Sequence, residues 1–351
     1  MQIIKKELTR NLQLIKPGQA KKEIVEQTGS YLSKAEHLIT YNDEICLSVH
    51  FRVGFEGAVA GEKFYKAIRS APTETVDITA DKGRVFVRSG EMVTEMEVAE
   101  IILPLENVPR HEPDDWVSLA PDFKEKSKLA AGAASKNLAR PVLCCIHMRD
   151  NIIEATDNYR IIRCRTAASL PAGIDLLIPK NSMLSLLKMN PAALAYANGW
   201  VSFKTAEDVC FSCRVLDATF PNTEPNFTQG WEGPINFQHG NLAEILDRAT
   251  HFAEENCLGD PIVDISAIDD LLMVEAGQED ARFRETCKID FRGKLKFHAN
   301  PLLLKDAFAM KFDKACFSRN GKRIDIKFEN ESVTYLLVCR SADETISDSF
   351  N

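Results

Sequence analysis

The segment around residue 157 brings together side chains that could take part in catalysis. Asp157, Tyr159 and Arg160 lie within four positions of one predicted turn, and such groups can transfer protons or hold an anionic substrate. The sequence offers no phosphate-cradling glycine loop and no nucleophile elbow to complete an active site. A hydrolase or transferase with an unrecognised α+β fold therefore remains an alternative, which turnover of a nucleotide or ester, lost on mutating Asp157, would favour.

The histidines and cysteines do not follow a metal-binding pattern. Cys210 and Cys213 lie three apart in an alternating strand pattern, VCFSCRV, so they point to opposite faces of a sheet, and no second pair completes a zinc set. We expect no metal and no cofactor, and we expect most of the ten cysteines to be buried thiols. The seven histidines, which show no ligand spacing, are His37, His50, His111, His147, His239, His251 and His298.

Length and composition indicate a folded protein of two or three domains. The chain has 351 residues, of which 45% are hydrophobic, enough for a sizeable core. Its beginning, MQIIKKELTR, lacks the apolar stretch of a signal peptide. No segment approaches the roughly 18 apolar residues of a membrane span. We expect a cytoplasmic protein without a membrane partner.

Two stretches rich in Pro, Asp, Glu, Asn and Gly break the periodic pattern and are typical of linkers: PLENVPRHEPDDW from Pro104 and FPNTEPNFTQGWEGP from Phe220. Each of the three parts has the same order of features, namely an amphipathic helix, alternating strands, a second helix after a strand, and more strands. We predict domains over residues 1–104, 122–222 and 235–340, linkers over 105–121 and 223–234, and a flexible acidic tail over 341–351.

Two sets of landmarks give the register of this threefold repeat. The apolar residues that close the strand before each second helix are spaced 119 and 119 apart: Val59, Ile178 and Phe297. The apolar residues that open each first helix are spaced 115 and 119 apart: Leu8, Phe123 and Leu242. Segments such as DVCFSCRV and RIDIKFE alternate polar with apolar residues, as antiparallel strands with one wet face do. The pattern predicts α+β domains, each with two helices packed on antiparallel sheets.

Charge is unevenly distributed along the chain. The net charge of −8 and the pI of about 5.5 argue against nucleic-acid binding by a generally basic surface. The predicted helices over residues 5–17, 61–70 and 122–136 carry +3, +2 and +2, the fourth carries +2, the fifth, over 241–256, carries −3, and the sixth carries +1. The helices thus total +7 and the remainder −15. If the helices line one surface, that surface attracts phosphates while the rest repels them; lysine-rich solvated helices are the alternative.

Three segments resemble the middle domain of the bacterial DNA polymerase III beta subunit, the beta sliding clamp: ARPVLCCIHMRDNIIEATDNYRIIR, LLIPKNSMLSLLK and FSCRVLDATFPN. The family signatures are an Arg-Pro-hydrophobic-Leu start, an Ala-Thr-Asp turn leading to Arg, a Val-Pro-Lys helix start, and an Arg-Leu followed by Phe-Pro. Both outer domains match more weakly but in register, so the resemblance spans nearly the whole chain.

The resemblance implies a head-to-tail homodimer that closes a ring of six domains, with helices inside and sheets outside. It implies a non-enzymatic processivity factor, associated with the nucleoid, that encircles double-stranded DNA without reading its sequence. The polymerase and the clamp loader are the implied partners, bound through short hydrophobic peptides. A ring-less, clamp-like peptide-binding scaffold is the alternative, which a monomeric mass would favour.

The family's partner-peptide pocket lies between the middle and C-terminal domains. Carried over by position, the pocket residues are Leu143, Thr156, Asn158, Tyr159, Arg160, Ile161, Pro221, Leu337, Val338 and Arg340. For Leu143, Ile161 and Val338, a plain core position is the alternative. A tethered tail could also occupy this cleft through Ile346 and Phe350, or have no role.

The chain departs from the family around this pocket. Asn158 and Tyr159 stand where Gly and His are common, and Cys339 stands where a proline is common. Pro225 and Asn226 replace a basic and an apolar residue, and eleven residues follow Arg340. These changes fit a phage, mobile-element or divergent version of the clamp.

The resemblance and the helix charges also predict contacts with DNA and between subunits. The loops with Lys21 and Lys22, and with Lys136, Asn137 and Arg140, correspond to family segments that touch the duplex. The predicted dimer contact joins Met96 and Val98 of the first domain to His251 and Phe252 of the third. The full DNA-binding set is Arg10, Lys16, Lys21, Lys22, Lys66, Arg69, Lys136, Arg140, Lys188, Arg248 and Lys305.

Overall fold

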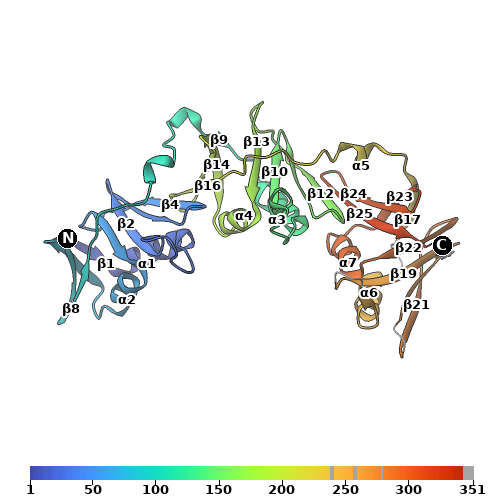
Figure 1. The fold of residues 1–351 in the computed structure, drawn as a ribbon, viewed down its shortest axis with the longest axis horizontal. Coiled ribbons are helices and arrows are strands. Elements are labelled where there is room, and N and C mark those ends of the chain that lie inside the picture. The colour runs from blue at the N-terminus through green and yellow to red at the C-terminus, as the bar shows by residue number, and fades with distance from the viewer. Residues whose placement is uncertain (238–240, 256–258, 278–279, 343–351) are drawn as a thin grey trace, which may run out of the picture. The chain divides into compact units, whose positions relative to one another are not determined.

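A computed structural model describes residues 1–237, 241–255, 259–277 and 280–342 of the chain. Contacts divide it into two compact units, and Figure 1 labels the helices and strands of both. Unit 1 comprises residues 1–128, 148–151 and 167–218, and unit 2 comprises residues 129–147, 152–166 and 219 onward. The boundaries fall within α3 (Phe123–Ala133) and β10 (Cys145–Arg149). The three-domain division stays a prediction.

Unit 1 contains two antiparallel sheets. The first has the order β1 (Gln2–Ile4), β6 (Thr75–Asp81), β7 (Arg84–Ser89), β8 (Met92–Glu97). The second has the order β5 (Gly57–Ala60), β2 (Ser30–Lys34), β3 (His37–Tyr41), β4 (Ile45–His50), β16 (Val209–Arg214), β15 (Trp200–Thr205), β14 (Pro191–Ala197), β9 (Val117–Ser118). Pairing of β4 with β16 makes the second sheet continuous across segments that are far apart in sequence. β13 (Asp175–Pro179) also belongs to this unit.

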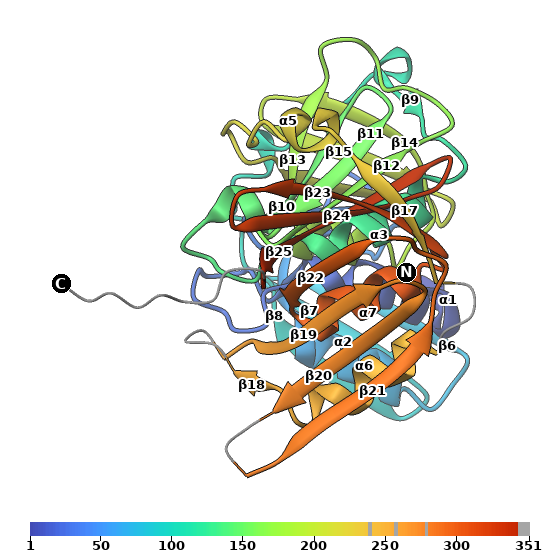
Figure 2. The same ribbon diagram turned by 90° about the vertical axis from the view of Figure 1, so that its right-hand side faces the viewer.

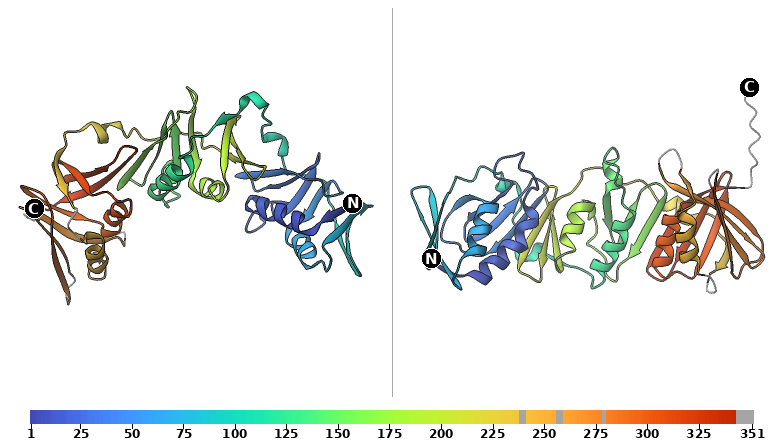
Figure 3. Two further views of the ribbon diagram at one scale, coloured as in Figure 1. Left: turned by 180° about the vertical axis from the view of Figure 1, so that it is seen from behind. Right: turned by 90° about the horizontal axis from the view of Figure 1, so that it is seen from below.

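The helices of unit 1 are α1 (Lys5–Ile15), α2 (Gly61–Ser70) and α4 (Lys180–Leu186). α1 buries Leu8, Leu12 and Ile15 along one stripe. Burying each such side chain stabilises the folded state by about 1.5–3 kcal/mol. α1 and α2 lie side by side (Figure 3), where Gln13 Nε2 donates to the Tyr65 hydroxyl at 2.7 Å. The apolar stripes thus leave the basic residues of both helices on the exposed side. The short 3-10 turns of unit 1 are Lys16–Gly18, Leu105–Asn107 and Pro113–Asp115.

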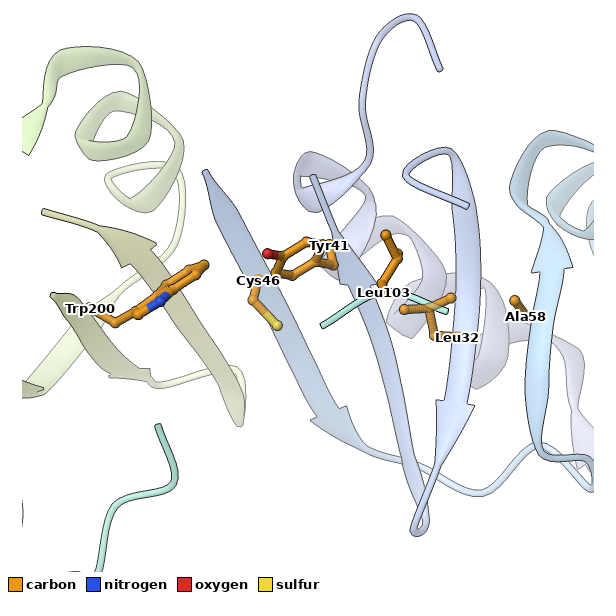
Figure 4. Packing of buried hydrophobic residues seen from close by; sticks show 6 residues of the cluster. All are labelled: Leu32, Tyr41, Cys46, Ala58, Leu103 and Trp200. Carbon is orange, nitrogen blue, oxygen red and sulfur yellow. The ribbon is translucent and has the colours of Figure 1, made fainter. Parts of the chain in front are cut away.

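The first predicted linker packs on the eight-stranded sheet. Figure 4 shows Trp200, Cys46, Tyr41, Leu103, Leu32 and Ala58 following one another across this region. Leu105 and Val108 are partly buried against the same cluster. The ring centres of Tyr41 on β3 and Trp200 on β15 are 6.2 Å apart. Leu103, Leu105 and Val108 belong to the same packing, so this segment forms part of the core over the sheet.

Unit 2 has one large antiparallel sheet, seen face-on in Figure 2. Its main path is β10, β11 (Ile152–Thr156), β12 (Arg160–Arg165), β25 (Val333–Ser341), β22 (Lys294–Ala299), β19 (Pro261–Ile268), β20 (Leu271–Gly277), β21 (Arg282–Lys288). A branch from β25 runs through β24 (Arg323–Glu329) and β23 (Lys314–Asn320) to β17 (Glu232–Asn236), and β18 (Glu254–Glu255) pairs with β19.

The helices of unit 2 are α5 (Glu224–Thr228), α6 (Leu242–Thr250) and α7 (Pro301–Ala309), with a 3-10 turn at Pro141–Cys144. α6 and α7 pack against each other and against strands of the sheet. Asn300 caps α7 by accepting the Leu302 N–H at 2.9 Å, and Pro301 takes the first helical position. α5 lies inside the second predicted linker, which is therefore less irregular than its composition indicates.

The repeat landmarks take equivalent places in the fold. The three strand-closing residues are buried in β5, β13 and β22, directly before α2, α4 and α7: Val59, Ile178 and Phe297. The three helix-opening residues are buried in α1, α3 and α6: Leu8, Phe123 and Leu242. The predicted α+β class is confirmed. No helix among residues 1–237, 241–255, 259–277 and 280–342 is long and apolar enough to cross a membrane.

Candidate functional site

The predicted turn closes the hairpin between β11 and β12. Asn158 adopts a φ of +79°, a conformation that Asn tolerates better than most residues with a side chain. The Thr156 hydroxyl donates to the Arg160 carbonyl at 2.7 Å. Asp157 Oδ1 accepts the backbone N–H groups of Tyr159 and Arg160 at 3.1 and 3.0 Å. Asp157 therefore builds the turn, and nothing in its surroundings presents it as a catalytic base.

Arg160 joins three segments that are distant in sequence. Its Nε donates to Asp157 Oδ2 at 3.0 Å, its Nη2 donates to the Gly132 carbonyl at 2.7 Å, and its Nη1 pairs with Asp306 of α7. Burial lowers the pKa of Arg160, but the neighbouring Tyr335 and Asp157 outweigh it, so the net pKa is raised. The guanidinium is thus a fixed positive charge, with 12% of its side chain exposed.

β25 runs antiparallel beside the hairpin and completes a partly exposed patch. Arg160 stands opposite Leu337, and the Val338 N–H donates to the Tyr159 carbonyl at 2.8 Å. Leu337 is buried, Val338 is half-buried and Tyr159 is 45% exposed. We name Tyr159, Arg160 and Val338 the hairpin patch; it combines an aromatic ring, an apolar side chain and a cation.

The other predicted pocket residues divide by exposure. Leu143, Thr156, Ile161 and Leu337 are buried; for Leu143 and Ile161 this burial is compatible with the core alternative, whereas Val338 is half-buried. Asn158 is exposed at the turn, Pro221 is exposed on the segment before α5, and Arg340 is exposed near the end of β25. The pocket assignment stays a prediction, and its accessible residues are Tyr159 of the hairpin patch together with Asn158, Pro221 and Arg340.

A buried ionic network that the sequence analysis missed lies under the second predicted linker. Glu154 on β11 stands opposite Arg163 on β12, and their side chains are only 1% and 3% exposed. Arg163 Nε donates to Glu154 Oε2 at 2.9 Å, and Arg163 Nη2 donates to the Thr223 hydroxyl at 2.8 Å. Arg163 Nη1 pairs with Glu224 at 3.0 Å, and His147 Nδ1 lies 3.1 Å from Glu154 Oε1.

Aromatic rings cover this network. The Arg163 guanidinium lies 3.9 Å from the centre of the Phe227 ring, and His147 stacks on Phe220 with centres 4.5 Å apart. Burial raises the pKa of Glu154, but the hydrogen bond from His147 and the Arg163 charge outweigh it, so the pKa falls below its ordinary value. Residues 220–227 are therefore held on β11 and β12 by charge as well as by packing.

A second anchor holds the same segment on β24. The buried Asp325 accepts hydrogen bonds from Gln229 Nε2 at 2.9 Å and from Arg323 Nε at 2.6 Å. Arg323 also donates to Asn226 Oδ1 at 3.1 Å. Asn226, one of the departures from the family pattern, thus helps to fix the segment around α5.

Most predicted DNA-binding residues are exposed, but some of them form ion pairs within the chain and others do not. Ten of the eleven are exposed and Lys305 is half-buried. Lys66 pairs with Glu62 at 2.5 Å, Arg248 pairs with Glu285 through bonds of 2.9 and 2.7 Å, and Lys305 pairs with Asp247. Over residues 1–237 and the later described ranges, the other eight form no ion pair: Arg10, Lys16, Lys21, Lys22, Arg69, Lys136, Arg140 and Lys188. Lys126, counted among the exposed helix charges from sequence, is instead buried.

The predicted dimer residues lie at or near the edges of two sheets. Met96 is in β8, the end strand of its sheet, but its side chain is buried, whereas Val98 is half-buried. His251 is exposed at the end of α6, and Phe252 stacks on Phe283 of β21 with ring centres 5.6 Å apart. β21 is itself an end strand.

The described residues offer little for covalent or metal chemistry. Among them, no group of three or more His, Cys, Asp or Glu side chains could hold a metal ion. Burial raises the pKa of the Cys46 thiol to about 12 and that of Cys145 to about 12. High thiol pKa values disfavour the reactive thiolate.

Comparison with known proteins finds similar sequences and similar folds. No family model matches the sequence. A beta sliding clamp of Staphylococcus aureus is 25% identical over 199 residues, which cover 51% of this chain and 52% of that protein, so the chain matches about half the length of this curated relative.

Solved structures match over nearly the whole chain. The DNA polymerase III subunit beta of Pseudomonas aeruginosa has a TM-score of 0.80 at 16% identity, covering 97% of this chain and 99% of the other. The DNA polymerase sliding clamp of Bacillus subtilis has a TM-score of 0.79 at 17% identity, covering 96% and 98%. The chain therefore has the sliding clamp fold.

Proposed function

We propose that this chain is a DNA sliding clamp: a ring-forming, non-enzymatic protein that encircles duplex DNA and tethers a polymerase. The observation that carries the proposal is the end-to-end likeness of its fold to DNA polymerase III beta subunits. The residue-level features of both units give this role a physical basis.

Helix charge supports DNA contact without sequence readout. α1 and α2 pack side by side and carry Arg10 and Arg69, and the 3-10 turn after α1 carries Lys16; all three are exposed and outside any described ion pair. Cations on helices that meet the phosphate backbone give attraction that does not depend on base sequence. Such binding lets a ring slide while its topology prevents escape.

Charge on the two end strands supports a head-to-tail dimer. β8 exposes Glu95 and Glu97, and β21 exposes Arg282 and Arg284. An end strand has unpaired backbone groups ready to pair with another chain, and these two edges have opposite charge. β8 of one subunit would pair with β21 of the next, which brings Val98 and Phe252 near the contact.

The hairpin patch is the proposed site for partner peptides. Tyr159 and Val338 offer an apolar surface, and the Arg160 guanidinium beside them, 12% exposed and bonded to Asp157, Asp306 and the Gly132 carbonyl, holds the hairpin that presents it. Aromatic and arginine side chains commonly dominate the energetics of such contacts. Tyr159 stands where His is common in the family, so the peptide preference of this chain should differ from that of other clamps.

Ring topology gives the deciding experiment. The protein is incubated with nicked circular DNA at a concentration where subunits exchange, then washed at high salt to remove electrostatically bound protein. A clamp has twice the 39.3 kDa chain mass by native mass spectrometry, stays on the circle, and is released when the DNA is cut.

The control is the same DNA linearised before incubation, which should retain no protein after the wash. Equal retention on circular and linear DNA would contradict encirclement. A monomeric mass together with peptide binding would instead support the ring-less scaffold.

A further inference from the structure

An open hollow of about 450 Å³ lies on unit 2 beside the start of β22. The rings of Phe291 and Phe317, both buried, form its floor. Its exposed charged rim consists of three cations and one acid: Arg292, Lys294, Arg319 and Glu232. This excess of positive charge suits an anionic ligand.

The loop that carries Arg292 and Lys294 is held by hydrogen bonds. Asp269 Oδ1 accepts the Gly293 N–H at 3.3 Å, and Asp270 Oδ1 accepts the Phe291 N–H at 3.1 Å. Gly293 has a φ of +132°, which side-chain-bearing residues rarely adopt. A fixed backbone thus presents both cations, and neither forms an ion pair with any residue whose placement is described.

Arg319 spans the hollow. Its Nη1 pairs with Glu232, and its Nη2 donates to the Lys294 carbonyl at 2.7 Å. The guanidinium carbon lies 4.7 Å from the centre of the Phe317 ring. The Lys294 carbonyl therefore accepts its hydrogen bond from a side chain and not from the backbone of a neighbouring strand.

β25 covers the edge of β22 only in part (Figure 2). Phe297 stands opposite Ser341 and His298 opposite Arg340, and the Ala342 N–H donates to the Lys296 carbonyl at 3.3 Å. Carbonyls two residues apart on a strand face the same side. The next acceptor along this edge is thus the Lys294 carbonyl, at the rim of the hollow.

We propose that the hollow binds the chain's own acidic C-terminal segment, residues 343–348, as an extension of strand along β22. The sequence after Ala342 reads DETISD and carries three acids. These residues lie outside the described part of the chain; the hollow, its charge and the point where β25 ends support their placement. In the existing register, Glu344 would stand opposite Lys294 on the same face.

This arrangement matches both charge and hydrogen bonding. Opposite charges directly across an antiparallel pair stabilise it, and Glu344 would meet Lys294 in this way. The backbone N–H of residue 344 would donate to the Lys294 carbonyl. Arg319 Nη2 would then be free to pair with a carboxylate of the segment. Because the segment is tethered two residues away, its effective concentration is high and weak contacts suffice.

The inference is independent of the proposed clamp function, because every group in it belongs to unit 2 and none to the hairpin patch. It also differs from the sequence-based expectation that Ile346 and Phe350 reach the partner cleft. In this proposal the segment binds along β22 and not in the partner cleft.

Hydrogen exchange of the C-terminal peptide in the full-length protein tests the proposal. Lys294→Glu and Arg292→Glu should each speed exchange of residues 343–348 by about two- to fivefold, the range for an exposed ion pair. Lys314→Glu is the matched control, since Lys314 is exposed at the start of β23 outside the hollow. Combining Lys294→Glu with Glu344→Lys should restore slow exchange.

Two results would overturn the proposal. One is exchange of the segment in the unmodified protein as fast as in a free peptide of the same sequence. The other is equal acceleration by Lys294→Glu and Lys314→Glu, with circular dichroism showing both folded. A chain ending at Ala342 should bind a polymerase-derived peptide with unchanged affinity; tighter binding would place the segment at the hairpin patch and refute the hollow.

Discussion

Replacing Arg163 with methionine is expected to cost about 3–5 kcal/mol in the free energy of unfolding, the range for breaking a buried ion pair from one side. The substitution removes hydrogen bonds to Glu154 and Thr223 and leaves the Glu154 carboxylate, 1% exposed, without its cation. The Glu224 pair contributes little to this figure because that side chain is 47% exposed.

A double substitution separates the burial of charge from the loss of contacts. Arg163→Met combined with Glu154→Leu removes both charges, so the expected cost is smaller than that of Arg163→Met alone. About 1–2 kcal/mol should remain, because the Thr223 hydroxyl and His147 Nδ1 lose their shared acceptor. The coupling between the two sites should therefore be large and favourable.

Urea unfolding followed by circular dichroism measures these free energies, and hydrogen exchange of residues 219–231 reports on the segment around α5. Arg165→Met is the control: Arg165 is exposed on the same strand, and its replacement should change stability by less than about 0.5 kcal/mol. Costs for Arg163→Met and Arg165→Met that agree within error would refute the account of the network.

The same network predicts a pH dependence. The folded pKa of Glu154 is lowered from 4.5 because His147 and Arg163 outweigh burial. A lowered carboxyl pKa adds stability that is fully present above the unfolded value and is lost as the pH falls through the folded one. Stability should therefore decline on acidification below about pH 4.5, and Glu154→Gln should flatten that part of the profile; an identical profile in this variant would contradict the assignment.

Three further substitutions test the proposed clamp. Phe252→Glu is expected to give monomers in native mass spectrometry, and an unchanged dimer would count against that contact. Reversing Lys21 and Lys22 together should weaken equilibrium DNA binding and make its logarithmic salt dependence shallower by roughly two to four units, whereas an equal loss on reversing sheet-face lysines such as Lys34 would argue against a basic channel. Arg160→Ala should weaken the binding of a polymerase-derived peptide by about tenfold or more, as measured by fluorescence anisotropy. Unchanged affinity would exclude the hairpin patch as the peptide site.

Local periodicity was enough to predict the elements of this fold. Val59, Ile178 and Phe297 mark the strand ends because an apolar residue before a helix start is a local feature of the sequence. The first helix ends near Pro17 as expected, since the chain passes from α1 into a 3-10 turn there. The class and repeat follow from such features, whereas the sheet order depends on pairs such as β4 with β16.

The buried ions could not be predicted in the same way. Glu154 and Arg163 are charged residues, a type that is rarely buried, and they are covered by a segment about 60 residues later in the chain. Arg160 and Asp306 are 146 residues apart. A sequence gives the charges of such residues but not the partners that tertiary structure brings to them.

Ion pairing within the chain also affects which cations are available to bind DNA phosphates. A count of helix charges weights all lysines and arginines equally, but Arg248 is held by a two-bond pair with Glu285, on a helix whose observed bounds also contain Glu244 and Asp247. The pair between Lys66 and Glu62 is far more exposed, 71% and 80%, and such pairs are worth about 0–1 kcal/mol. A phosphate can therefore displace Glu62 much more easily than Glu285. The proposed attraction for DNA is thus stronger at α1 and α2 than at α6, although the repeat makes these helices equivalent in the fold.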